Sequence, residues 1–459
     1  MSDKGLTGVI STHFPSVRSK KFFSIFLVIL VAQFIDLTIG TLSDLFVDFA
    51  TSPLGVGLFI AIAVIYGIAQ YLILKSVKGT ISQSGGEKYR TSLNFITNAV
   101  TVFQYILLGV MASIVLQILI ASEYYTGLLA IGSTISYGLA AALTGLLAYW
   151  FFSWFRRNRA LVVLLYGLAA VTISINAIDT ILYFDITILG TKPLVTNPES
   201  GVSFPDITGL VADIQVISLN AYFILTWAGT TMLLRHNIQR IGKAKFWLLV
   251  AAPMVFFMSF YIGFYESIIN APTDQLREED LSSILLPIMI ILFSAEAAII
   301  LFGIGFRSVA KSITQTNKVR DYMIITAYGF ILFFTAAAAT ISAAGYPPFG
   351  IANVLLVGPY SYLILVGLYG SAISIAQDTK LRQSIATSAR NELNILDKIG
   401  IAQVQREVEK KVLAATKANA EILAQESGIQ PSLTDEEIHE ILNQAALEIR
   451  HKKEGDNPA

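Results

Sequence analysis

Long stretches of consecutive apolar residues, separated by short polar segments, dominate the pattern along the chain. A helix rises 1.5 Å per residue, so about 20 apolar residues are needed to cross roughly 30 Å of hydrocarbon. Ten stretches have this length: 22–41, 54–74, 97–120, 127–153, 160–183, 210–234, 246–269, 283–305, 322–344 and 351–376. They are continuous and do not alternate as barrel strands would. The pattern therefore predicts an all-α fold, a polytopic membrane bundle of about ten transmembrane helices at 22–376.

The pattern changes after residue 376, where apolar residues become sparse but regularly spaced. From Leu381 to Ile399 they average 3.6 residues apart, the spacing of one helical face. No glycine or proline occurs between Gly370 and Gly400, so we expect the last span to continue as one rod. We predict a C-terminal cytoplasmic helical domain at 377–459, continuous with that span. The alternative is a partly disordered tail that folds on a partner.

Lysine and arginine are distributed unevenly between the predicted connections. The amino-terminal tail at 1–21 and the even-numbered connections carry nineteen of them, whereas the odd-numbered connections carry only Lys192 and Arg277. Because cytoplasmic loops are enriched in these residues, the distribution predicts that both termini are cytoplasmic. The first span also has an alternative interpretation as a signal peptide, since SVRSKK precedes its apolar run. Cleavage there would leave nine spans.

The composition agrees with a protein that lives in a bilayer. Hydrophobic residues make up 54% of the chain and charged residues 14%, which is too apolar for a soluble domain of 459 residues. The absence of cysteine excludes disulfides, thiolate metal sites and cysteine nucleophiles. Nucleotide-binding loops, zinc-binding helices and the common hydrolase motifs are also absent. The sequence thus predicts no catalytic residue, no cofactor and no nucleic-acid partner.

Acidic side chains inside the predicted spans are the unusual chemistry of this chain. Asp36, Asp179, Asp213 and Glu266 fall toward the external ends of their spans, and Glu296 falls near the midplane. A carboxylate at such depth costs roughly 2.5–3.5 kcal/mol on insertion scales. No span contains lysine or arginine, so an ion pair within the membrane is not available. Each acid must therefore be protonated, hydrogen-bonded by neutral groups, exposed to water or neutralised by a cation.

These five acids are our candidates for binding protons or cations. Asn220 and Tyr328 lie at a similar depth to Glu296 and are candidate supporting groups. The alternative for Glu296 is a protonated side chain that hydrogen-bonds between helices, and Asp213 and Glu266 could equally lie among the headgroups. Oxygen ligands would suit Na⁺ or Ca²⁺ rather than zinc or copper. All four histidines fall on the predicted cytoplasmic side, so no histidine metal centre is expected outside.

The junction between membrane and tail carries one resemblance to known proteins. GPYSYLILVGLYGSAISIAQDTKLRQSI, at 358–385, resembles the corresponding segment in a group of uncharacterised polytopic membrane proteins of ammonia-oxidising archaea. The resemblance covers this junction and the tail. It implies a setting in the plasma membrane and no known activity.

Two functional hypotheses follow from the sequence. The first is a sensor, transducer or assembly subunit that relays a membrane or external signal to the cytoplasmic domain, with a protein partner or a second copy bound through residues 377–459. Its basis is the uninterrupted helix that leads into a tail without catalytic residues. The alternative is a proton- or cation-linked transporter that uses the carboxylates inside the membrane.

Overall fold

All regular secondary structure in the described part of the chain is α-helical. The computed structural model describes residues 20–41, 47–82, 87–157, 159–188, 207–236, 238–264, 297–308, 310, 317–338, 346–377 and 403. Within these ranges there is no β-strand. The predicted all-α class is therefore confirmed for the described residues.

Eight of the ten predicted spans coincide with helices that are long and apolar enough to cross a membrane. They are α1 (Lys20–Thr41), α3 (Pro53–Ser82), α4 (Glu87–Ala121), α5 (Thr126–Arg157), α6 (Leu161–Ile188), α7 (Ile207–His236), α11 (Asn317–Ala338) and α12 (Ile351–Gln377). The protein is thus an integral, multi-pass membrane protein.

The two other predicted spans are described only in part. The seventh, at 246–269, coincides with α9 (Lys243–Phe264), which is apolar and contains Pro253. Of the eighth, at 283–305, the structure describes only the end, in the short apolar helix Ala297–Ser308. Two further short helices are α2 (Val47–Thr51) and α8 (Ile238–Ile241). The count of ten spans stays a prediction.

The predicted cytoplasmic domain at 377–459 lies outside the described residues, except for Gln377 and Gln403. Gln377 is the last residue of α12. The predicted rod beyond it and the helical domain of the tail therefore stay predictions. Gln403 is nevertheless informative, because it contacts the membrane bundle.

Helices α3 and α4 extend well beyond the apolar runs that predicted them. Helix α3 begins with the pair Ser52 and Pro53: the Ser52 hydroxyl oxygen accepts a hydrogen bond from the Gly55 N–H at 3.2 Å, and proline suits the first helical position. The helix then continues through KSVKGTIS to Ser82, and α4 begins at Glu87, before its apolar run. Hydrophobicity marks the part of a helix that lies in lipid, not where the helix ends.

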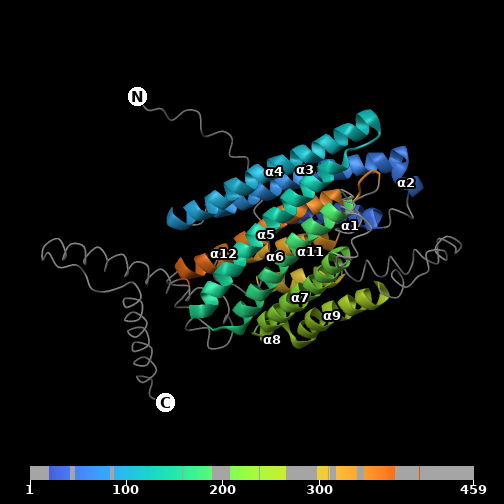
Figure 1. Ribbon diagram of the computed structural model, residues 1–459. Coiled ribbons are helices and arrows are strands. Elements are labelled where there is room, and N and C mark those ends of the chain that lie inside the picture. Colours follow the sequence, from blue (N-terminus) through green and yellow to red (C-terminus); the bar gives the residue numbers. More distant parts are fainter. Residues whose placement is uncertain are drawn as a thin grey trace, which may run out of the picture.

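Helix α12 lies inside the bundle. It contacts α1, α3, α4, α5 and α11. In Figure 1, α3 and α4 form one flank, α7 and α9 form the opposite flank, and α12 runs between them. Its approach to α11 is close because Gly367 has no side chain: a Cβ there would lie 2.7 Å from the Thr326 nitrogen and 2.8 Å from the Tyr322 carbonyl oxygen.

The helix termini meet at two ends of the bundle. At one end, the start of α1 meets the helix Ala297–Ser308 where the Arg307 guanidinium lies 4.9 Å from the centre of the Phe23 ring. At the other, the start of α3 meets the segment before α12 where the rings of Phe59 and Phe349 lie 5.5 Å apart. We call the first the basic end, because it carries Lys75, Lys78, Arg156, Arg157, Arg235, Lys243, Lys245, Arg307 and Arg320. Its assignment to the cytoplasm stays a prediction.

Candidate functional site

A buried carboxylate joins α1 to the first turn of α12. Asp36 is fully buried; its Oδ1 accepts a hydrogen bond from the Gly350 N–H at 2.8 Å, and its Oδ2 accepts one from the Asn353 N–H at 3.2 Å. The first N–H groups of a helix have no partner within the helix, and the helix dipole favours a negative charge there. Asp36 therefore caps α12 from a different helix, across a sequence separation of 314 residues.

The segment before α12 presents these N–H groups to Asp36. Residues 346–350 read YPPFG, and Gly350 has a φ of +91°, a conformation that favours glycine. The two prolines have no N–H to donate, so the turn itself offers few donors that would need a partner. The chain can then enter α12 at Ile351 with its first free N–H groups directed at the carboxylate.

Two buried amide side chains lie beside Asp36. The Asn353 Nδ2 donates to the Gln33 carbonyl oxygen at 2.9 Å, and the Gln33 Nε2 donates to the Leu332 carbonyl oxygen at 3.4 Å. Among the described residues, neither the Gln33 Oε1 nor the Asn353 Oδ1 has a hydrogen-bond partner. Both residues and Asp36 line a cavity of about 10 Å³, close to the lower limit for one water molecule. The site thus offers buried oxygen acceptors that need a donor or a cation.

Only some of the predicted site residues occupy interior positions. Asp179 on α6 is buried, and its Oδ2 has no hydrogen-bond partner among the described residues. Asp213 on α7 is exposed. Glu266 and Glu296 lie outside the described residues. No three His, Cys, Asp or Glu side chains in the described ranges lie close enough together to hold a metal ion.

The two predicted supporting residues lie in different surroundings. The Asn220 Nδ2 donates to the Val216 carbonyl oxygen of its own helix at 2.8 Å. Tyr328 is buried on α11, where its ring packs 4.3 Å from that of Phe26. Glu296, which they were predicted to support, lies outside the described residues. The role of the five acids in binding protons or cations stays a prediction.

An aromatic cluster at the basic end joins α5, α12 and the carboxyl-terminal segment. The Tyr369 ring of α12 stacks on Trp150 of α5, with centroids 3.7 Å apart, and it also lies parallel to Trp154 at 6.2 Å. The Trp154 Nε1–H donates to the Gln403 Oε1 at 3.1 Å, and Gln403 is buried. A residue of the tail is therefore docked beside the end of α12.

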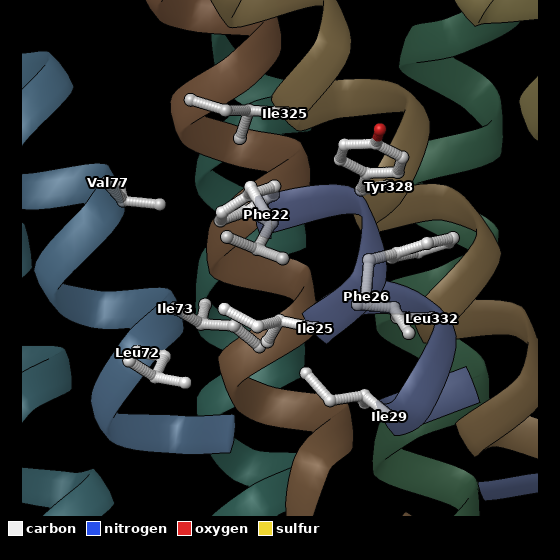
Figure 2. Close-up of a pocket in the computed structure, with 11 residues that line it drawn as sticks. Phe22, Ile25, Phe26, Ile29, Leu72, Ile73, Val77, Ile325, Tyr328 and Leu332 are labelled. Atoms are coloured by element: carbon white, nitrogen blue, oxygen red, sulfur yellow. The ribbon is translucent and has the colours of Figure 1, made fainter. Parts of the chain in front are cut away.

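An apolar crevice lies along the same α1 helix, nearer the basic end (Figure 2). Its walls come from α1, α3, α11 and α12, and they include Phe22, Ile25, Ile73, Tyr328 and Leu363. Its volume is about 20 Å³ by the measure that gives about 10 Å³ for the cavity beside Asp36, so it is a shallow groove. Ile29 lines both this crevice and the cavity beside Asp36. Helix α1 therefore borders two adjacent hollows, and only the one beside Asp36 has carboxyl and amide side chains in its wall.

Several of these residues had no signal in the sequence analysis. Gln33 and Asn353 are single polar residues in apolar runs, and only the spacing of Gln33 and Asp36, three residues apart on one helical face, could have linked one of them to the acid. The docking of Gln403 against Trp154 joins positions 249 residues apart and had no local sign.

Comparisons with known proteins identify no relative of this chain. No protein family, no curated protein and no solved structure matches the chain. The class of the protein, an all-α multi-pass membrane protein, therefore rests on its own sequence and structure. The resemblance of residues 358–385 to archaeal membrane proteins stays a prediction.

Proposed function

We propose that this membrane protein is a transducer or assembly subunit in which α12 relays a signal to a cytoplasmic domain formed by residues 377–459. The observation that supports the proposal is the hydrogen bond between Trp154 and Gln403, beside Tyr369 of α12. It brings a residue of the tail into contact with α5, at a tryptophan whose ring lies 6.2 Å from that of Tyr369 in α12. A shift of α12 would change the surface on which the tail docks.

The two ends of α12 are held in ways suited to such a relay. At its start the helix depends on Asp36 of α1, and near its end it depends on aromatic contacts with Trp150. The 27 residues between Ile351 and Gln377 span about 40 Å as a helix. A change at the capped end can therefore reach the basic end as a rigid translation or rotation, the kind of motion that switching proteins use.

The proposal includes a setting and a partner. The protein would lie in the plasma membrane with both termini in the cytoplasm, as the excess of Lys and Arg at the basic end favours. The tail would bind a protein partner or a second copy through residues 377–459, which include the apolar face between Leu381 and Ile399.

Photo-crosslinking in the full-length, membrane-embedded protein tests the relay. Benzoylphenylalanine at position 154 should capture the segment around Gln403, whereas the same probe at the exposed Tyr149 of α5 should not. Asp36→Asn removes one hydrogen-bond acceptor from the start of α12. It should change the crosslinking yield at position 154 about fivefold, which corresponds to the lower end of the coupling free energies known between distant sites. Asp213→Asn, on the exposed face of α7, is the matched control.

The relay is wrong if Asp36→Asn leaves the yield unchanged in a protein that remains folded. The partner role has a separate readout. Deletion of residues 377–459 should abolish any complex that the gently purified full-length protein forms. A complex that survives the truncation, or a protein that purifies alone and monomeric, contradicts it.

One observation favours the second function, a proton- or cation-linked transporter. The unpartnered oxygens of Gln33 and Asn353 beside Asp36 form a cluster of acceptors around a small cavity. Sodium and proton flux into vesicles that contain the purified protein would test this function. Gln33→Leu and Glu296→Gln should each abolish flux, and Ser113→Ala on the exposed surface of α4 should not. The absence of flux, or flux that survives both substitutions, removes this candidate.

A further inference from the structure

The apolar crevice has the chemistry of a site for a hydrocarbon chain. Its lining is apolar apart from the Tyr328 hydroxyl. Phe22, Ile25 and Leu72 are the partly exposed residues of the lining that we name as its rim. Figure 2 shows side chains of α3 and α1 directed toward each other across the gap, with α12 behind. An extended peptide segment would bring more N–H and C=O groups than the single Tyr328 hydroxyl can satisfy. Water gains little in an apolar hollow.

The crevice borders the lipid-facing surface of the bundle. The outward faces of the same two helices expose large apolar side chains, Val28 on α1 and Ile68 on α3. In a membrane these faces are covered by acyl chains. A chain from the adjacent lipid therefore needs no change of environment to enter the crevice.

A positive charge lies near the Phe22 end of the crevice. The Arg307 guanidinium lies 4.9 Å from the centre of the Phe23 ring, and Phe23 follows the crevice residue Phe22 in α1. Figure 2 shows the Tyr328 hydroxyl directed toward the Val77 and Ile325 end of the crevice, away from Ile29. Among the described residues, no acidic side chain forms an ion pair with Arg307. A guanidinium therefore lies close to this end of the crevice, and the Tyr328 hydroxyl belongs to its wall.

We propose that the crevice binds one anionic phospholipid from the leaflet at the basic end. One acyl chain would lie along the groove between α1 and α3, partly in the surrounding lipid, and the phosphate would accept hydrogen bonds from the Arg307 guanidinium and the Tyr328 hydroxyl. Guanidinium groups bind phosphate oxygens in a bidentate geometry, which favours arginine for this role. The lipid would hold α1 against α3 and α12 where protein contacts leave a gap. The site does not depend on the proposed relay function.

Native mass spectrometry of the full-length protein tests this site. The protein is exchanged into detergent with either phosphatidylglycerol or phosphatidylcholine of the same acyl chains, and retained lipid is counted. We expect one retained phosphatidylglycerol per protein. Arg307→Gln should lower this retention about fivefold, which is the contribution of one basic residue to the attraction of anionic lipid near a membrane surface. Arg235→Gln, an exposed arginine at the basic end of α7, should leave retention unchanged. Arg307→Lys should retain most of it.

A second variant separates the acyl chain from the headgroup. Ile25→Trp fills the crevice from its partly exposed rim, and it should lower the retention of both lipids while Arg307 stays in place. Equal retention of the two lipids by the wild-type protein overturns the proposal, as does equal loss with Arg235→Gln and Arg307→Gln. A benzoylphenylalanine probe at Leu72 that captures a segment of this chain or of a second copy, and not lipid, overturns it as well.

Discussion

Helices α12 and α4 both cross the membrane, but their surroundings are opposite. In the membrane-spanning window of α12, 94% of the residues are buried inside the protein, against 33% in α4. The more exposed helix is the more apolar one, with a mean hydropathy of 2.2 against 1.8. Lipid is as apolar as leucine, so hydrophobicity does not draw helices together within a bilayer. Small and polar residues such as Gly367 and Asn353, rather than apolar ones, mark the helix at the centre.

The largest expected effect is the loss of the carboxylate that caps α12. Asp36→Ala leaves the Gly350 and Asn353 N–H groups buried without an acceptor, so we expect the free energy of unfolding to fall by about 3 kcal/mol. Unfolding in mixed detergent micelles, followed by circular dichroism, measures it. Asp213→Ala, at an exposed acid, should change stability by less than about 0.5 kcal/mol. Equal effects of the two substitutions would mean that the cap contributes nothing.

A methyl group added to each helix compares their packing directly. Gly367→Ala places a Cβ against the α11 backbone and should destabilise the protein by about 2 kcal/mol, as overpacking does. Gly109→Ala on α4 meets no atom within 4 Å and should be neutral or slightly stabilising, because alanine favours the helix. The difference in melting temperature between the two variants is the measurement. If Gly109→Ala lowers the melting temperature more than Gly367→Ala does, α4 packs at Gly109 against a group outside the described residues.

The buried face of α4 offers a stabilising substitution. Gln104 is buried, and neither of its amide atoms has a hydrogen-bond partner among the described residues. Gln104→Met keeps the length of the side chain and removes both polar atoms, so we expect the free energy of unfolding to rise by about 1 kcal/mol. Gln104→Glu, which adds a charge at the same place, should lower it. A loss of stability with methionine would show that the amide has a partner in the membrane.

The smallest expected effect concerns the hydrogen bond that joins the two helices. The hydroxyls of Thr97 on α4 and Tyr362 on α12 lie 2.7 Å apart. Hydrogen bonds between membrane helices contribute about 0.6 kcal/mol on average, so Tyr362→Phe should cost about that much. The double-mutant cycle with Thr97→Val isolates the pair. A coupling energy of zero would mean that the hydroxyls interact equally well with other groups.

The sequence predicts the membrane helices well and their contacts poorly. The predicted span at 351–376 matches α12 to within one residue, because a long apolar run has only one stable form in lipid. The longer α3 and α4 were underestimated, since polar turns outside the lipid carry no hydropathy signal. For the site, the sequence shows that Asp36 needs neutral hydrogen-bond partners or another way to offset the free-energy cost of a carboxylate inside the membrane. It cannot show that those partners are backbone groups of α12, because tertiary packing brings the two segments together.

The cap on α12 also has a consequence for biogenesis. Chain synthesis proceeds from α1 toward α12, so the Asp36 carboxylate is made about 314 residues before the N–H groups that it binds. During insertion it must be kept protonated or hydrated until α12 arrives. Nascent chains that stop short of α12 would therefore leave an uncompensated acid in the bilayer.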